Sequence, residues 1–132
     1  MKDLHTMKVY KKQGGYRSLK KAFAQKPEEI VEAVKASGLR GRGGAGFPAG
    51  LKWSFLAKDV FPRYLCCNAD ESEPGTCQDR ELLLKNPHML IEGMILCSYA
   101  CRVETGYIYL LGEFHDLNFN MEKAIEDAYA KG

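Results

Sequence analysis

Two loop sequences carry the residues whose types and spacing could do chemistry. The first is glycine-rich and reads Gly41-Arg42-Gly43-Gly44-Ala45-Gly46. Glycines let backbone N–H groups approach an anion without side-chain obstruction. Arg40, Arg42 and Lys52 add positive charge around this loop. The combination favours a phosphate-binding loop over a flexible surface turn.

The glycine loop does not match either of two common nucleotide-binding loops. Gly41-x-Gly43-x-x-Gly46 formally fits the dinucleotide fingerprint, but that fingerprint requires a strand before it and a helix after it. The residues that end at Gly38 have helical spacing instead. A Walker A loop needs a glycine before its lysine, whereas Leu51 precedes Lys52. The sequence therefore predicts a phosphate site of another kind.

The second loop is acidic and reads Asn68-Ala69-Asp70-Glu71-Ser72-Glu73-Pro74-Gly75. It follows Arg63–Cys67, an apolar run that we expect to be a buried strand. Ligands of open α/β sheets bind beyond the carboxyl ends of strands. Its carboxylates could bind a metal, or accept hydrogen bonds from ribityl or ribose hydroxyls, and a solvated acidic turn is an equally good interpretation. No nearby histidine completes a transition-metal set, so we assign no metal ligand.

Three aromatic residues, Phe47, Trp53 and Phe55, bracket Lys52. They could stack on a flavin or adenine ring, but their spacing favours packing in a core. His88 stands at an expected helix start without a nucleophile to serve, so we expect a structural role for it. No Gly-x-Ser-x-Gly element supports nucleophilic hydrolysis.

The elements that position these loops follow from apolar periodicity, glycine and proline. We expect residues 1–15 to be irregular, residues 39–50 to be a loop, and Asn86 to cap a buried helix that opens at Pro87. The expected helices cover residues 16–24, 27–37, 79–85, 87–103 and 117–131, and the expected strands residues 63–67 and 107–111. This order predicts an α/β protein in which residues 64–111 form a βαβ crossover.

Composition limits the class of protein. The chain of 132 residues is 45% apolar and 27% charged, which is typical of a globular domain. No apolar run is long enough to span a bilayer, and the start lacks the apolar region of a secretory signal, so we expect a cytoplasmic location. Residues 1–52 hold 12 Lys and Arg against 4 Asp and Glu, whereas residues 53–132 hold 7 against 13. The basic part could attract nucleic acid, but the acidic second half argues against that function.

The cysteines do not suggest a metal centre. There are five, with no Cys-x-x-Cys, in a chain without a signal sequence. This usage predicts reduced thiols and no zinc or iron–sulfur ligation by this chain. Cys97 and Cys101 are four apart on an expected helix, and we interpret them as small core residues.

Longer stretches of the sequence resemble one family. Residues 38–54, Gly-Leu-Arg-Gly-Arg-Gly-Gly-Ala-Gly-Phe-Pro-Ala-Gly-Leu-Lys-Trp-Ser, look like the signature of the NADH-binding flavoprotein of respiratory complex I, which is the 51 kDa-type subunit, or F subunit in bacteria. Residues 67–76, with Asp79-Arg80, match as well. So do Pro87-His88 with Ile91-Glu92-Gly93, and residues 106–109 with Gly112-Glu113. The resemblance runs from about Gly15 to the last residue.

The resemblance implies a fold, two cofactors and a set of site residues. The fold would be the N-terminal part of an FMN-binding α/β domain with a Rossmann-like βαβ core, with residues 1–37 as a helical segment and 38–132 as the incomplete domain. NADH would give a hydride to FMN, and electrons would pass on to iron–sulfur clusters and quinone. Glu73 would lie near the nicotinamide. The cofactor-binding residues would be Gly41, Arg42, Gly43 and Lys52 at the FMN phosphate; Asn68, Asp70, Glu71 and Ser72 at the flavin; and Phe47 and Phe55 at the adenine. The rest of the loop (Gly44, Ala45, Gly46, Pro48, Ala49 and Gly50) would bind FMN or NAD.

The resemblance also implies partners and a location, and it has departures. The chain would join other peripheral-arm subunits, especially the 24 kDa-type [2Fe–2S] protein, on the cytoplasmic face of the inner membrane. Ala49 stands where the family commonly has Thr. The family continues with a Cys-Gly-Glu-Glu segment, a ubiquitin-like domain and a helical domain that holds a [4Fe–4S] cluster, so we expect an N-terminal fragment that is inactive alone. A diaphorase subunit of an NAD-linked hydrogenase or formate dehydrogenase, and a non-catalytic nucleotide-binding module, are the alternatives.

Overall fold

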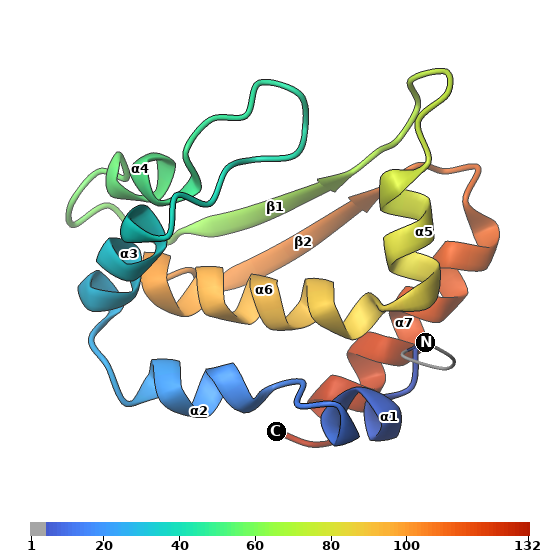
Figure 1. Cartoon of the computed structure of the whole chain (residues 1–132), viewed down its shortest axis with the longest axis horizontal. Helices are drawn as coiled ribbons and strands as arrows, with labels where there is room; N and C mark the ends of the chain where they lie inside the picture. The colour runs from blue at the N-terminus through green and yellow to red at the C-terminus, as the bar shows by residue number, and fades with distance from the viewer. Residues whose placement is uncertain (1–4) are drawn as a thin grey trace.

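The structure is a computed structural model that describes residues 5–132. Short helices precede a parallel βαβ unit, and a long helix follows it (Figure 1). The elements are α1 (Met7–Lys12), α2 (Arg17–Phe23), α3 (Pro27–Ala36), α4 (Ala49–Ser54), β1 (Tyr64–Ala69), α5 (Gln78–Lys85), α6 (Pro87–Cys101), β2 (Thr105–Leu110) and α7 (His115–Tyr129).

The sheet within residues 5–132 has two strands. β1 and β2 pair in parallel, with Tyr64 opposite Thr105 and Ala69 opposite Leu110. Parallel strands require a crossover, and here α5 and α6 provide it. The expected βαβ unit is therefore confirmed, as is the α/β class.

Local sequence signals explain where several helices begin and end. Pro27 stands at the start of α3, where its missing N–H costs nothing, and the Lys26 N–H donates to the Glu29 carboxylate at 2.7 Å. α6 starts at Pro87 and ends at Arg102, whose left-handed backbone stops the helix. Asn86 occupies the N-cap position of α6, as expected, but its side chain makes no capping bond and its Oδ1 is buried without a partner.

Two apolar clusters hold the elements together. The larger one joins the crossover helices to α7 and contains Ala69, Leu83, Ile91, Leu117, Met121 and Ala124. The smaller one joins α2, α3 and α6 through Ala22, Ile30 and Ala100, with Trp53 of α4 packed against it. Both clusters use α6, so this helix connects the N-terminal helices to the sheet.

The structure corrects five expectations about individual elements. Residues 5–15 are not irregular, because α1 lies within them, and residues 1–4 of that stretch lie outside the described part. Ala49 and Gly50 already belong to α4, and Thr105 and Gly106 belong to β2. The strands are not fully buried, because exposed and less exposed residues alternate along β1, and in β2 only Ile108 and Leu110 are partly buried. One face of the sheet is therefore open.

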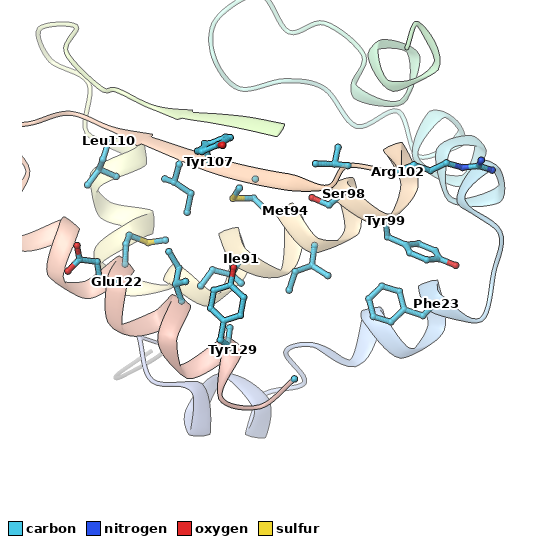
Figure 2. A pocket seen from close by; sticks show the side chains of 18 of the residues that line it. Phe23, Ile91, Met94, Ser98, Tyr99, Arg102, Tyr107, Leu110, Glu122 and Tyr129 are labelled. Atoms are coloured by element: carbon cyan, nitrogen blue, oxygen red, sulfur yellow. The ribbon is translucent and has the colours of Figure 1, made fainter. Parts of the chain in front are cut away.

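The fifth correction concerns α6, which we expected to be buried. One side of α6 faces a cavity of about 870 Å³ that β2, α7 and the end of α2 also line (Figure 2). Met94, Ile95 and Tyr99 of α6 line it. The apolar residues of α6 therefore line a cavity on one side of the helix and pack in the core on another. No helix among residues 5–132 has both the length and the apolar character needed to cross a membrane.

Candidate functional site

The glycine loop is closed at its base by backbone hydrogen bonds. The Gly41 N–H donates to the Phe47 carbonyl at 2.9 Å, and the Ala49 N–H donates to the Leu39 carbonyl at 2.8 Å. Across this base, the Arg40 guanidinium donates to the Gly46 carbonyl at 3.1 Å. The loop is therefore a defined turn with fixed ends, and α4 begins directly after it.

The tip of the loop is open and depends on glycine. Gly44 and Gly46 have φ of 120° and 63°, a conformation that L side chains rarely adopt. A Cβ placed on Gly43, Gly44 or Gly46 would meet no other atom within 4 Å. The glycines leave free space beside the backbone, which is what an approaching phosphate requires.

Gly50 has a different role from the glycines at the tip. It is buried, and a Cβ on it would lie 2.5 Å from the backbone nitrogen of Lys35 and 2.8 Å from its Cα. Such contacts are far shorter than real carbon contacts, so α4 can approach α3 this closely only with glycine. Close packing of α4 on α3 therefore requires glycine at position 50.

Two cations near the loop remain available to a ligand. Arg42 and Lys52 are both exposed, on the loop and on α4. The structure places them in no ion pair within residues 5–132. Arg40, by contrast, is occupied by the Gly46 carbonyl. Arg42 and Lys52 are thus the side chains that could pair with a phosphate beside the loop.

The acidic loop is held by its own side chains. The carboxylate of Glu71 accepts the Asp79 N–H at 2.9 Å and the Arg80 N–H at 3.0 Å, which are free donors at the start of α5. These backbone bonds, chiefly that of Arg80, lower the pKa of Glu71. The Thr76 hydroxyl donates to the Glu73 carbonyl at 2.6 Å and closes the turn. Glu71 therefore acts as a clamp between the loop and α5.

Asp70 is the acidic residue that points to a ligand. Its N–H donates to the Asn68 Oδ1 at 3.0 Å, and its own Oδ1 is buried without a hydrogen-bond partner. Buried acceptors are nearly always satisfied, so an unpaired one at the carboxyl end of β1 fits a donor supplied by a ligand. Ser72 and Glu73 lie exposed on the same loop. This residue set fits a flavin ring, which carries a donor N–H.

The glycine loop and the acidic loop project to the same side of the molecule, with β1 running between them (Figure 1). One offers backbone N–H groups and cations, the other carboxylates and a hydroxyl. The pair fits a ligand with a phosphate at one end and a polar ring at the other. The cavity of about 870 Å³ is a separate feature, because none of the predicted site residues lines it.

The aromatic residues divide between two environments. Phe47 and Phe55 are 46% and 66% exposed, with ring centroids 6.1 Å apart. Trp53 is half-buried against the smaller cluster. The core interpretation is thus correct for Trp53 and wrong for the two phenylalanines, which form an exposed pair beside the glycine loop.

Other residue classes give no further site. Among residues 5–132, no group of three or more His, Cys, Asp or Glu is placed to hold a metal ion. Cys101 is buried and Cys97 is half-buried. A hydrogen bond to Cys101, together with burial, raises the pKa of the Cys97 thiol. Both lie inside the fold, as expected.

Sequence reasoning missed the clamp made by Glu71. The signal was present, because α5 starts after Cys77, which makes no side-chain capping bond, and so its first N–H groups need an acceptor from elsewhere. An acidic residue a few positions upstream is a natural acceptor. The sequence could therefore have predicted that an acidic residue such as Glu71 accepts the first N–H groups of α5, but not which one.

Comparisons with known proteins place these loops in a family. The chain is 52% identical to an F subunit of NADH-quinone oxidoreductase (number 2) from Rhizobium meliloti, over 98% of this chain and 31% of that protein. It is 50% identical to the F subunit of the same enzyme from Aquifex aeolicus, over 98% and 30%. The chain thus spans about a third of the length of these curated relatives.

A solved structure and a family model agree with the similarity to these F subunits. The NAD+-reducing [NiFe]-hydrogenase in its H2-reduced state superposes with a TM-score of 0.74 at 45% identity, over 82% of this chain and 19% of that chain. Residues 34–132 match the family model described as the Nuo51 FMN-binding domain. These residues include both candidate loops. The chain therefore belongs to the family of the Nuo51 FMN-binding domain.

Proposed function

We propose that this chain supplies part of the FMN- and NADH-binding pocket of an NADH–quinone oxidoreductase. The observation that carries the proposal is the buried, unpartnered Asp70 Oδ1 at the end of β1, on the same side of the molecule as an open glycine loop. Bound FMN would accept a hydride from NADH and release electrons singly to iron–sulfur clusters. The chain's own contribution is to bind and orient the two cofactors.

On this proposal the glycine loop binds phosphate. Backbone N–H groups of the tip and the free cations Arg42 and Lys52 neutralise the anion. The exposed pair Phe47 and Phe55 offers a surface on which the adenine of NADH stacks. The remaining loop residues (Gly41, Gly43, Gly44, Ala45, Gly46, Pro48 and Ala49) shape the cradle for FMN or NAD, and Gly50 holds it against α3.

The acidic loop orients the ring in the same proposal. Asp70 accepts a hydrogen bond from the flavin, and Asn68 and Ser72 flank it. Glu73, exposed on the loop, lies near the nicotinamide. Both oxygens of Glu71 are already used by the amides of α5. We therefore assign Glu71 to positioning the loop instead of to direct flavin contact.

The relatives support a proposal about the wider assembly. We propose that residues 38–132 belong to the cofactor domain, that residues 1–37 precede it as a helical segment, and that the chain works beside other subunits, among them the 24 kDa-type [2Fe–2S] protein. The location would be peripheral, on the cytoplasmic face of the inner membrane. The [4Fe–4S] cluster of the family would be held by residues that this chain does not contain.

A diaphorase role is the second candidate, because the superposed structure is an NAD+-reducing hydrogenase. The proteins that copurify with the chain from its native host distinguish the two. Quinone-linked subunits support the first proposal. Hydrogenase or formate dehydrogenase subunits without quinone-linked ones contradict it.

The cofactor proposal can be tested in a chimera. This chain replaces the matching third of the Rhizobium meliloti relative, and FMN and riboflavin are titrated by flavin fluorescence. Arg42→Gln should weaken FMN binding about tenfold, because a charge-assisted phosphate contact is lost. Riboflavin, which lacks the phosphate, should bind with the same affinity to the parent chimera and to the Arg42→Gln chimera.

The matched control is Arg17→Gln on α2, an exposed arginine far from the loop in sequence. It should leave both affinities unchanged. A chimera that is folded by circular dichroism but binds FMN no more tightly than riboflavin would contradict the phosphate role of the loop.

A further inference from the structure

The N-terminal helices are attached to α6 through one carboxylate. Glu92 of α6 accepts the Tyr10 hydroxyl at 2.5 Å and the Tyr16 N–H at 2.9 Å, both on Oε2. Its Oε1 accepts the Ser18 hydroxyl. The donors come from α1, from the turn after it and from α2. The side chain of Glu92 therefore binds all three parts of the chain to α6.

A second polar side chain of α6 lies under the same segment. His88 is fully buried, and its Nδ1 shares a hydrogen bond of 2.9 Å with the Tyr16 hydroxyl. The Tyr10 ring stacks on the imidazole at 5.7 Å. The Nε2 of His88 is buried without a hydrogen-bond partner. The ring therefore depends on Tyr10 and Tyr16 to exclude water from it.

We name residues 5–23 the N-terminal strap. Its own turn is closely packed, because a Cβ on Gly15 would lie 2.1 Å from the Tyr10 ring. Tyr16 adopts a left-handed backbone with φ of 62°, which an L residue holds only when its contacts compensate. The strap ends where Phe23 packs on Tyr99 of α6 at 4.9 Å. Polar anchors hold its first half, and its second half is held by the Phe23–Tyr99 contact and by Ala22 in the smaller apolar cluster.

The charged and titratable groups that face these anchors come from the strap and from α7. His88 faces Tyr10 and Tyr16 of the strap, His5 just before α1, and Asp127 of α7. Glu92 faces the same two tyrosines and Ser18. Within residues 5–132, Glu92 forms no ion pair. The anchors are therefore hydrogen bonds to a carboxyl group and to an imidazole, two groups whose protonation changes with pH.

We propose that the N-terminal strap is a pH-sensitive latch, closed on α6 at neutral pH and released in acid when His88 gains a proton. A proton on His88 puts a charge into a fully buried site whose cover is the strap itself. Hydration of the imidazolium then requires Tyr10 and Tyr16 to move away. A second proton, on Glu92, removes the acceptor that holds the same residues.

The direction of both steps agrees with the local electrostatics. Burial lowers the pKa of His88, His5 lowers it further, and Asp127 only partly opposes them. The closed latch thus binds the proton more weakly than the open one. The contribution of His88 to closure is fully present above about pH 6.5, the ordinary histidine value, and the closure equilibrium weakens by up to about tenfold per pH unit below it.

Glu92 acts at lower pH. Burial raises the pKa of its carboxyl, but hydrogen bonds from Ser18, Tyr10 and Tyr16 outweigh burial and leave it below the ordinary value. Its contribution to closure is present above that ordinary value and is lost as the pH falls through the lowered one. Release begins with the histidine and is completed by the glutamate.

Release would change the cavity beside α6. Phe23 and Tyr99 both line it, and Phe23 stands at its rim in Figure 2. Removing the strap takes Phe23 away and exposes the apolar side of α6. The latch therefore controls access to an apolar surface that the cofactor loops do not share.

The test is an amide NMR titration of the chain from about pH 7.5 to about pH 4.5, a range that spans the ordinary histidine value. Signals of the strap should move towards unfolded positions below about pH 6.5, while those of β1 and β2 stay dispersed. Loss of strap and strand signals in one transition would overturn the proposal. So would a strap that stays folded to the end of the titration.

Variants identify the group responsible. His88→Phe keeps the ring that stacks with Tyr10 but cannot gain a proton, so the strap should stay closed through the histidine step. His115→Phe, at an exposed histidine, should release like the parent chain. If His88→Phe does not fold, the titration of the parent chain still decides.

Glu92→Gln tests the second anchor. It keeps the size of the side chain but removes the charge, so the strap should exchange its amide hydrogens faster already at neutral pH. Glu126→Gln on the exposed side of α7 is its control. Equal strap exchange in the two variants would show that Glu92 is not an anchor.

Discussion

The glycine loop and the acidic loop lie on the same side of the molecule but are ordered in opposite ways. Hydrogen bonds at its base order the glycine loop, and its tip has free space around it. Side chains order the acidic loop, with Glu71 bonded to α5 and Thr76 to the Glu73 carbonyl. The first loop can adapt its backbone to an anion, whereas the second presents side chains already fixed in place.

This difference teaches which substitutions each loop tolerates. In the glycine loop the limits are conformation and close approach, so replacements that add a Cβ should matter most. In the acidic loop the limits are hydrogen bonds, so isosteric changes that remove an acceptor should matter. Four predictions, in descending order of expected effect, test this contrast.

The largest effect is expected at the base of the glycine loop. Gly50→Ala should lower the free energy of unfolding by about 2 kcal/mol, because the new Cβ overlaps the backbone of Lys35. Urea unfolding followed by circular dichroism measures this. Gly43→Ala, where the Cβ meets nothing, should change stability by less than about 0.5 kcal/mol. Similar losses in both variants would remove the distinction between base and tip.

A smaller effect is expected from backbone strain at the tip. Gly44 has φ of 120°, so Gly44→Ala should lower the free energy of unfolding by about 1 kcal/mol. Gly43→Ala serves again as the neighbour without a positive φ. Should Gly44→Ala be as stable as the parent chain in urea, the loop conformation does not need glycine there.

The acidic loop should respond to pH through Glu71. Hydrogen bonds from α5, first that of Arg80, hold its pKa below the usual value. The stabilisation is therefore present above that value and is lost as the pH falls through the lowered pKa. The amide proton shifts of Asp79 and Arg80 should report this step in an NMR titration. Glu71→Gln should abolish it and Glu73→Gln should preserve it, and a step that survives in Glu71→Gln rules out the clamp.

The smallest effect is expected at the base of the glycine loop, from Arg40. Its guanidinium donates to the Gly46 carbonyl in an exposed position. Arg40→Gln should lower the free energy of unfolding by about 0.5 kcal/mol, since an exposed bond competes with water. Arg17→Gln gives the reference for loss of one surface arginine. A loss above about 1 kcal/mol would mean that side chains order this loop too.

Much of the fold could be predicted from local signals. Pro27 and Pro87 marked two helix starts, and the apolar runs near Cys66 and Ile108 marked both strands. The βαβ connection followed from their order. α1 was missed because six residues around Val9 make a short helix that is stabilised by contacts with α6 and α7 instead of by its own sequence.

The candidate site was predictable in its residue types but not in its division of work. The residue types showed two polar loops, but not that Glu71 accepts two backbone amides of α5 while the Asp70 Oδ1 is buried without a partner. The sequence does not distinguish Gly50 from Gly44. A Cβ on Gly50 would overlap α3, whereas a Cβ on Gly44 would meet no atom within 4 Å. Those distinctions depend on which distant elements pack together, and that information is spread over the whole chain.

Trp53 is a natural fluorescence probe for one region of the molecule. It is the single tryptophan of the chain, half-buried on α4 against the cluster of α2, α3 and α6. The larger cluster around Leu117 contains no indole. Tryptophan emission therefore reports the packing beneath the glycine loop, separately from the packing around α7.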